Sequence, residues 1–303
     1  MADLLGDTVG PYRLESVVGN GRTGDVYCGT HTSTGKQAAV KVLRAAIAIG
    51  VEFPERFVTE MRTVSTLHHP NIVALYDFGV ADGVCFIALE VMRSSVRALL
   101  RLRPPAEPLP LTLAVNLVSQ AAEGLAYAHQ HGVIHRDIQP SNLLLDDIKV
   151  ASLADNDGND RDDGDDADVL KVTDFGLARL AAGASMLTSS GAALGSGVML
   201  GAPAYMSPEL CRGHALDERS DLYALGVVLY EMTTGVLPFP AIRLEDAIRE
   251  HLYSPPPLPR LLNPEIPALL ERVMLRCLAK HPDDRFDTAT DLVRALRAAV
   301  PEA

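Results

Sequence analysis

The segment His135–Asn142 constrains the fold of this chain more than any other stretch. It holds a carboxylate and an amide on one polar, proline-containing loop that is too irregular for a helix. Residues 132–134 before it and 143–145 after it are mostly apolar, which predicts short buried segments that fix the loop. Asp137 can accept a proton from a hydroxyl group, and the amide oxygen of Asn142 can help to bind a hard cation such as Mg²⁺.

Length and composition allow two lobes that share a cleft. The chain has 303 residues, 48% of them hydrophobic and 22% charged, which is an ordinary globular balance. Of the net charge of −12, residues 155–168 carry −7, because they hold eight Asp and one Arg. The rest of the chain is only mildly acidic, so we expect no nucleic-acid partner.

The cysteines and the N-terminus indicate the compartment. Four Cys lie far apart without a C-x-x-C pair, which argues against a zinc site or a disulfide framework and is typical of a reducing cytoplasm. No apolar signal begins the chain, and the uncharged run 180–208 contains enough Gly, Pro and Ser to predict a loop. We therefore expect a cytoplasmic protein without a membrane segment in this chain. A membrane anchor in a longer parent chain stays open.

Residues 12–42 predict a hairpin with a Gly-rich tip followed by a third strand. The tip is Gly19-Asn20-Gly21-Arg22-Thr23-Gly24, with β-branched residues on both sides and no helical pattern after it. A flap that closes over nucleotide phosphates suits this context better than a dinucleotide-binding turn, which leads into a helix. An ordinary Gly-rich hairpin is the alternative.

Lys41 lies among apolar residues on that third strand and needs a partner if it is buried. Residues 53–68 have the apolar spacing of a helix, and Glu60 falls on its apolar stripe. A Lys41–Glu60 ion pair is the prediction. The alternatives are a Lys whose stem lies along a strand edge and a solvated helical Glu.

The remaining pattern predicts two further strands and several helices. Strands are expected at 72–75 and 84–89, after the helix ends at His68-His69-Pro70. The expected helices are 111–131, 221–232, 258–278 and 288–300. Residues 146–168 form an acidic insert between two short strands. It lacks the Glu of a Ca²⁺-binding EF-hand loop, so a solvated, disordered extension is favoured over dedicated Ca²⁺ binding.

Taken in order, these motifs resemble a bacterial, eukaryotic-like (Hanks-type) Ser/Thr protein kinase catalytic domain over about residues 12–296. The likeness rests on the Gly19–Val26 loop, Ala39-Val40-Lys41, Glu60, His135-Arg136-Asp137 with Asn142, Asp174-Phe175-Gly176, Ser207-Pro208-Glu209, Asp221 and Arg285. It implies an α+β, two-lobed fold with a small antiparallel β-sheet lobe plus one helix and a larger, mainly helical lobe. The implied boundaries are an N-terminal tail 1–11 and a kinase domain 12–298, divided into an N-lobe 12–89, a hinge 90–92 and a C-lobe 93–298.

The resemblance also implies roles for single residues. Lys41 would hold the α- and β-phosphates of ATP and pair with Glu60, and Asp137 would take the proton of the protein hydroxyl. Asn142 and Asp174 would bind Mg²⁺, with Mn²⁺ as an alternative. Contacts with the nucleotide would come from Gly19, Gly21, Gly24, Val26, Ala39, Leu89, Glu90, Met92 and Leu144.

Three structural roles follow from the same resemblance. The side chains of Val64, Leu75, Phe175 and His135 would stack as an apolar column based on Asp221. Glu209 would pair with Arg285 to brace the larger lobe. Arg136 would bind a phosphorylated loop, with Thr188, Ser189 or Ser190 as acceptors.

Two residues depart from the family pattern within the chemistry. Gln139 stands where the Ser/Thr branch has Lys, and Ala202 stands where it has Thr or Ser. Loss of one such electrostatic contact typically costs about 10²–10³ in rate. The sequence favours Mg²⁺-ATP-dependent phosphorylation of protein Ser/Thr, including autophosphorylation. A nucleotide-binding pseudokinase or scaffold is the alternative, and a small-molecule kinase is a third reading that residues 207–209 argue against.

Overall fold

The computed structural model describes residues 4–21, 23–44, 53–146, 169–178, 180 and 203–301. These residues fall into two compact units, each described by itself here: 1–92 with 174–200, and 93–173 with 201–303. The core of the acidic insert, the acceptors Thr188, Ser189 and Ser190, and Ala202 lie outside the described residues.

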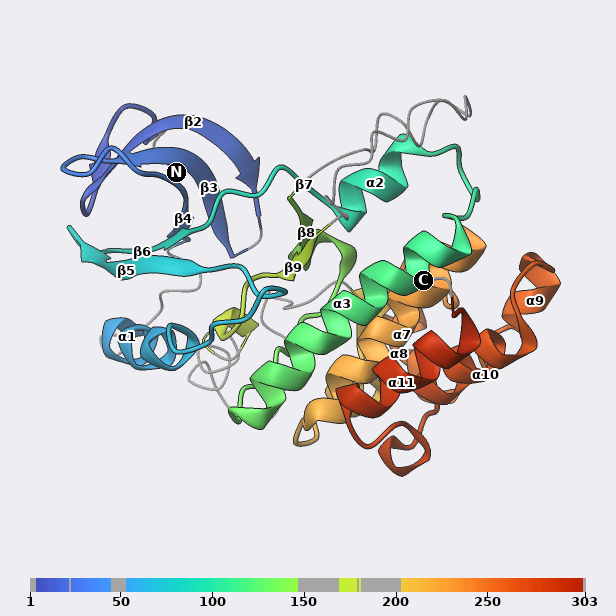
Figure 1. Ribbon diagram of the computed structural model, residues 1–303. Helices are drawn as coiled ribbons and strands as arrows, with labels where there is room; N and C mark the ends of the chain where they lie inside the picture. Colours follow the sequence, from blue (N-terminus) through green and yellow to red (C-terminus); the bar gives the residue numbers. More distant parts are fainter. Residues whose placement is uncertain are drawn as a thin grey trace, which may run out of the picture. The chain divides into compact units, whose positions relative to one another are not determined.

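The first unit is built on a six-stranded sheet in the order β1-β2-β3-β4-β6-β5, and every neighbouring pair is antiparallel (Figure 1). Its strands are β1 Thr8–Val9, β2 Tyr12–Asn20, β3 Gly24–His31, β4 Gln37–Leu43, β5 Leu75–Ala81 and β6 Val84–Leu89. β1 lies within the segment assigned to an N-terminal tail, and it pairs with β2.

Strand alternation gives this sheet one packed face. Ala38, Val40 and Val42 of β4 point to the hydrophobic cluster that includes Tyr12 and Phe86. Ala39 and Lys41 therefore point to the opposite face, since side chains alternate along a strand. This pattern positions the lysine of the site.

The helix of the first unit, α1 Phe53–Val64, buries Phe53, Phe57 and Met61 along one stripe, and it packs against β5. The predicted end at His68 is wrong. The hydroxyls of Ser65 and Thr66 donate to the last-turn carbonyls, which terminates the helix early.

The strand predicted at 72–75 is also misplaced, because β5 begins at Leu75. It turns into β6 through Asp82 and Gly83, whose φ values are 50° and 79°. Positive φ at both central residues is the geometry of a tight hairpin turn, for which Asp-Gly is a preferred sequence.

The second unit is mainly helical and carries a small sheet in the order β7-β8-β9. Its strands and 3₁₀ turns are β7 Ser94–Ser95, β8 Leu143–Leu145, β9 Leu170–Val172, η1 Pro140–Asn142, η2 Pro203–Tyr205 and η3 Pro282–Asp284. Its helices are α2 Val96–Leu102, α3 Leu111–Gln130, α6 Pro208–Arg212, α7 Glu218–Thr234, α8 Leu244–Tyr253, α9 Pro259–Leu262, α10 Ala268–Cys277 and α11 Ala289–Ala299. An antiparallel sheet unit with one helix and a larger helical unit are the fold class expected from the sequence.

Two helices form the centre of the second unit. α3 packs against α7 and α11, and α7 packs against α10 (Figure 1). Every residue of α7 from Ser220 to Thr234 is buried, which explains a helix that is apolar almost all round. The expected helices 111–131 and 221–232 are thus confirmed to within a few residues.

The helix predicted over 258–278 is wrong, because it is two helices. Pro264 and Pro267 separate α9 from α10. Asn263 ends α9 and donates its side-chain amide to the carbonyl oxygen of Thr233 at 2.9 Å, so the break is tied to α7.

The short strands expected around the acidic insert are confirmed. β8 and β9 pair antiparallel, with Leu143 opposite Val172 and Leu145 opposite Leu170. The amide of Asp146 continues the ladder to the carbonyl oxygen of Val169 at 3.2 Å. The insert therefore leaves and re-enters at the end of one hairpin.

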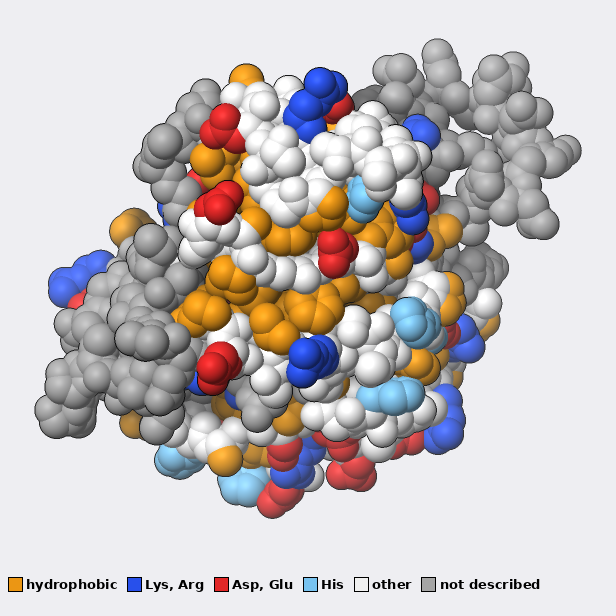
Figure 2. Space-filling view, turned by 90° about the vertical axis from the view of Figure 1, so that its left-hand side faces the viewer, with side chains coloured by type: hydrophobic (Ala, Val, Ile, Leu, Met, Phe, Trp, Pro, Cys, Tyr) orange, Lys and Arg blue, Asp and Glu red, His pale blue; other side chains and the backbone are white. Residues whose placement is uncertain are grey.

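Two properties of the described residues bear on partners. None of their helices combines the length and the apolar character that crossing a membrane requires. Figure 2 shows one face on which Lys and Arg side chains are scattered singly between Asp and Glu. That face carries no continuous basic surface among the residues drawn in colour.

Candidate active site

The loop His135–Asn142 is anchored from below by Asp221 of α7. The backbone amides of His135 and Arg136 donate to the Asp221 carboxylate at 2.9 Å and 2.8 Å, and His129 contacts it at 2.8 Å. Arg136 has a φ of 71°, a left-handed conformation that is costly for a residue with a side chain. The hydrogen bonds from these two backbone amides to Asp221 hold the strained turn in place.

The charge on Asp221 is retained although its side chain is 1% exposed. Burial raises its pKa, but the hydrogen bond with His129, the nearby His135 and the Arg136 amide together bring the pKa below the ordinary value. A carboxylate that stays ionised can accept all three bonds at once.

Gln139 and Asn142 hold the carboxylate of Asp137. The side-chain amide of Gln139 donates to both carboxylate oxygens at 2.9 Å, and Asn142 donates to the Asp137 backbone carbonyl at 2.8 Å. A longer bond of 3.3 Å joins Asn142 Nδ2 to Asp137 Oδ2. The amide nitrogen of Asn142 faces Asp137, which leaves its amide oxygen as the atom that suits a cation.

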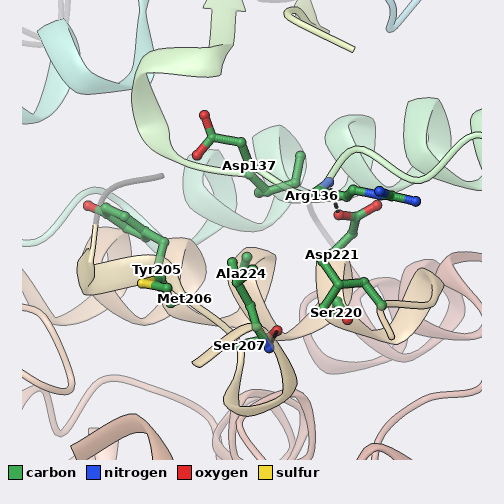
Figure 3. Close-up of a pocket in the computed structure, with 11 residues that line it drawn as sticks. Arg136, Asp137, Tyr205, Met206, Ser207, Ser220, Asp221 and Ala224 are labelled. Atoms are coloured by element: carbon green, nitrogen blue, oxygen red, sulfur yellow. Dashed lines mark hydrogen bonds between the residues drawn. The ribbon is translucent and has the colours of Figure 1, made fainter. Parts of the chain in front are cut away.

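A small pocket lies between this loop, the η2–α6 segment and α7 (Figure 3). Figure 3 shows Asp137 across the pocket from Tyr205, Met206 and Ala224. The lining residues are Arg136, Asp137, Ile138, Tyr205, Met206, Ser207, Leu210, Leu216, Ser220, Asp221 and Ala224. Asp137 thus lines a small pocket that is bordered by both apolar and polar side chains.

Lys41 forms an ion pair with Asp174 within the first unit. Lys41 Nζ lies 2.6 Å from Asp174 Oδ2, and the two side chains are 6% and 19% exposed. The buried ammonium therefore has the partner that its desolvation requires. The predicted Lys41–Glu60 pair stays a prediction.

The segment Asp174–Gly176 lies against α1. A Cβ on Gly176 would meet Glu60 Cγ at 2.9 Å and Val64 Cγ2 at 3.1 Å, and the φ of Gly176 is 78°. Only glycine fits both that approach and that dihedral. Asp174 also has a positive φ, 70°. Glu60, Val64 and Asp174 are thus brought to one place.

The Gly-rich hairpin is braced at its base. Asp25 accepts from Arg44 at 2.7 Å and from Asn20 at 3.1 Å, and the Gly21 amide donates to the Gly24 carbonyl at 2.9 Å. The Arg44 hydrogen bond is the main reason why the pKa of Asp25 is lowered. A Cβ on Gly24 would lie 2.3 Å from the Val42 carbonyl oxygen, so β3 can approach β4 only with glycine there.

Gly19 differs from the other two glycines, because a Cβ there would meet no atom within 4 Å. The fold itself therefore does not require glycine at this position. Glycine would be required at this position if a ligand approaches the backbone closely.

The sheet face that carries Lys41 also carries three of the residues that are predicted to contact the nucleotide. Val26 lies opposite Lys41, and Ala39 lies opposite Leu89. Val26, Ala39 and Leu89 are each half-buried. Partly exposed apolar side chains beside a buried ammonium suit an aromatic base joined to phosphates.

The other predicted nucleotide contacts have separate surroundings. The Glu90 side chain accepts from the Ala74 amide at 3.1 Å and its amide donates to the Ala74 carbonyl at 2.9 Å, which fixes the chain before Met92. Leu144 is half-buried on β8 between two buried leucines. Phe175 is buried in the first unit, and Leu75 pairs with Leu89.

The predicted Glu209–Arg285 pair is confirmed. Two guanidinium nitrogens of Arg285 lie 2.8 Å and 2.9 Å from the Glu209 carboxylate oxygens, and Ser220 donates to the same carboxylate at 2.6 Å. Burial opposes the charge of Glu209, but Arg285 and Ser220 outweigh it and lower its pKa to about 2.

Asp174 of the first unit and Asn142 of the second unit stay the predicted ligands of a divalent cation. Asp174 supplies carboxylate oxygens and Asn142 an amide oxygen, which are the ligand types that Mg²⁺ prefers. Among the described residues, no group of three or more His, Cys, Asp or Glu is arranged to hold a metal ion by itself.

Sequence reasoning missed the network around Tyr205. The Tyr205 hydroxyl donates to Glu231, Arg97 donates to Tyr205, and Arg97 also contacts Glu231 at 3.1 Å. Burial, with Glu231, raises the pKa of the Tyr205 hydroxyl. Glu231 lies in the apolar run of α7, and that position was the available signal for a buried partner.

Comparison with known proteins gives one family. The profile described as protein kinase domain matches residues 12–295. The chain is 35% identical over 299 residues to serine/threonine-protein kinase Pkn1 of Myxococcus xanthus, covering 99% of this chain and 40% of that protein. It is 33% identical over 298 residues to PrkC of Bacillus subtilis, covering 98% and 42%. The chain therefore spans less than half the length of these two relatives.

A solved kinase-domain structure also matches this chain. The crystal structure of the Mycobacterium tuberculosis PknI kinase domain superposes with a TM-score of 0.70 at 26% identity. The match covers 97% of this chain and 98% of that one.

Proposed function

Because the chain belongs to the protein kinase domain family, we propose that it transfers the γ-phosphoryl group of Mg²⁺-ATP to Ser and Thr hydroxyls of proteins. The matched relatives Pkn1 and PrkC are named serine/threonine-protein kinases, which supports this acceptor class. They give no support to the pseudokinase alternative.

One observation carries the proposal: the Asp137 carboxylate is held by two neutral amide side chains at the edge of a pocket. Gln139, a neutral amide, bonds both carboxylate oxygens of Asp137. In this proposal, Asp137 acts on a substrate hydroxyl. It orients the hydroxyl toward the γ-phosphorus and accepts its proton as the new O–P bond forms, while the bond from the γ-phosphorus to the bridging oxygen breaks and ADP leaves.

The residues of the first unit bind the nucleotide. Lys41 would supply a cation for the α- and β-phosphates, and the backbone of the Gly-rich hairpin would contact the phosphates. Val26, Ala39 and Leu89 bury the base. Asp174 and Asn142 are the residues that would hold Mg²⁺, which would supply positive charge to the phosphates.

Autophosphorylation is part of the proposal. The Arg136 guanidinium has a buried Nε without a hydrogen-bond partner among the described residues. A phosphorylated Ser or Thr would provide the acceptor that this nitrogen lacks. The candidate acceptors remain Thr188, Ser189 and Ser190.

A reducing, cytoplasmic location is proposed as well, since all four cysteines are free.

The test is phosphoryl transfer from labelled ATP to a generic basic protein, with and without Mg²⁺. We expect label on Ser and Thr in the wild type and a loss of at least about 10³-fold in Asp137→Asn. Binding of a fluorescent ATP analogue, measured in parallel, should be retained by the variant. Equal transfer by wild type and Asp137→Asn contradicts the proposal, and replacing Mg²⁺ with Mn²⁺ tests the choice of metal.

A further inference from the structure

A second pocket of the helical unit lies between α2 and the C-terminal end of α7. Its lining consists of Arg97, Leu100, Arg101, Arg103, Pro104, Pro105, Ala106, Glu107, Glu231 and Gly235. Figure 1 shows the end of α2 and the connection to α3 beside the end of α7. Asp137 and its neighbours line a different pocket.

Arginine dominates the charge of this second pocket. Arg97 and Arg101 are four residues apart on α2 and so share one face of the helix, and Arg103 is the residue at its C-terminal end. Two carboxylates, Glu107 and Glu231, oppose these three guanidinium groups. The pocket is therefore biased toward an anion.

The arginines differ in how far their bonding capacity is used. Arg97 is engaged by buried Glu231 and by Tyr205. Arg103 pairs with Glu107, but its Nε is buried without a partner within the described part of the chain. Arg101 has no carboxylate within ion-pair distance in that same part. Arg101, which is exposed, thus has donors open for an incoming acceptor, and the buried Nε of Arg103 lacks a partner within the described residues.

The turn at Ala106 packs closely against the end of α7 in this pocket. Ala106 has a φ of 62°, and Gly235 has a φ of 76°. A Cβ on Gly235 would lie 2.5 Å from the backbone of Ala106, so only glycine lets the end of α7 touch this turn. Pro104 and Pro105 restrict the chain just before it. A preformed turn lowers the entropic cost of binding.

We propose that this pocket is a binding site for a phosphate monoester, with Arg101 and Arg103 as its guanidinium ligands. Planar guanidinium groups match phosphate oxygens with paired hydrogen bonds, and a dianion competes better than the single carboxylate of Glu107 for Arg103. The Arg103–Glu107 pair opens at small cost, since Glu107 is 45% exposed. A phosphoserine side chain and free inorganic phosphate share this chemistry.

The site is linked to the pocket beside Asp137 through hydrogen bonds between their lining residues. Arg97 and Glu231 line the phosphate pocket, and both bond to Tyr205, which lines the pocket that Asp137 borders. Any ligand that draws Arg97 away from Glu231 also changes the partners of Tyr205.

The test is fluorescence anisotropy of a labelled Ala-phosphoserine-Ala peptide with the whole chain, in the absence of ATP. We expect saturable binding, little or none with the unphosphorylated peptide, and at least about tenfold weaker binding to Arg101→Glu. Arg249→Glu is the matched control, because Arg249 is an exposed arginine on α8 of the same unit. Arg136→Ala controls for phosphate binding at the catalytic loop.

Three results would overturn the proposal: no binding to the wild type at millimolar peptide, equal weakening by Arg101→Glu and Arg249→Glu, or loss of binding in Arg136→Ala alone. Competition with inorganic phosphate distinguishes the sources. Displacement at equal concentration supports the site with the free ion as its ligand, and a large excess requirement supports the phosphorylated side chain.

Discussion

Gln139 donates its side-chain amide to both carboxylate oxygens of Asp137, at 2.9 Å each. This neutral donor occupies the position where the resemblance to Ser/Thr kinases predicts a lysine. It fixes the carboxylate without placing a positive charge beside the phosphoryl group that Asp137 would serve. The orientation of the proton acceptor and the stabilisation of transferred charge are therefore separable at this position.

Gln139→Lys should raise kcat by up to about 10²-fold, because an ammonium at this position adds charge stabilisation while still bonding Asp137. Gln139→Leu should lower kcat, since it removes both bonds without adding charge. The measurement is steady-state transfer at saturating ATP. A folded Gln139→Lys variant with unchanged or lower kcat would contradict the argument.

The Glu209–Arg285 pair should make stability depend on pH at the acid end. The pKa of Glu209 falls from an ordinary 4.5 to about 2, so its stabilisation is fully present above about pH 4.5 and is lost as pH falls through about 2. That shift corresponds to a contribution on the order of 3 kcal/mol.

Urea unfolding of wild type and Glu209→Gln between pH 7 and pH 2 measures this. The variant should be less stable by about 3–5 kcal/mol at pH 7, because it leaves Arg285 buried and unpaired. The difference between the two proteins should shrink toward pH 2. A difference that stays constant across this range would show that Glu209 does not titrate with folding.

Local patterns in the sequence predicted the faces of the elements better than their ends. The apolar stripe from Phe53 to Met61 placed the buried side of α1 correctly. The end of α1 depends on the hydrogen bonds that the hydroxyls of Ser65 and Thr66 make to backbone carbonyls. The spacing of apolar residues does not predict these bonds.

The candidate site was predictable in composition but not in pairing. Glu60 and Asp174 are both acidic groups that could satisfy Lys41, and only the three-dimensional structure shows Asp174 at 2.6 Å. The left-handed backbone of Arg136 and Asp174 was also beyond the sequence, because neither residue is glycine. The Asp82-Gly83 turn, in contrast, was a signal that was available and unused.

The Asp25–Arg44 pair should matter for ATP binding more than for turnover. It braces the base of the Gly-rich hairpin without belonging to the phosphate-contacting backbone. Arg44→Met should raise KM for ATP by about three- to tenfold with a smaller change in kcat, because a looser hairpin binds phosphates less well. Steady-state kinetics with ATP varied gives both parameters. Arg13→Met, an exposed arginine on the neighbouring strand β2, is the control and should change neither.

Tyr205 should couple the substrate pocket to α7. Tyr205→Phe removes the hydroxyl that bonds Glu231 and Arg97, which should cost about 1–3 kcal/mol of stability. Tyr205 lines the pocket that Asp137 borders, so loss of its hydroxyl should change KM for the protein substrate more than KM for ATP. Urea unfolding and two-substrate kinetics test the two parts. An unaltered unfolding free energy would show that the hydroxyl bonds are energetically idle.

The Lys41–Asp174 pair should be detectable without any nucleotide. Its two side chains are largely buried, so removing one charge leaves the other buried without a partner. Removing both charges leaves no unpaired charge. Lys41→Met and Asp174→Asn should each destabilise the protein. The double variant should be less destabilised than the sum of the two, with a coupling of about 1–3 kcal/mol.

The same variants separate stability from catalysis. Lys41→Met should lower kcat/KM for ATP by at least about 10²-fold at temperatures where it is fully folded, since it removes the cation proposed for the phosphates. Lys41→Arg keeps the charge and should preserve more of the stability than of the rate, because its planar fork does not reproduce the point contact of an ammonium. A coupling energy near zero in urea unfolding would mean that Lys41 and Asp174 are adjacent without being energetically paired, and Glu60 would then be the partner to test.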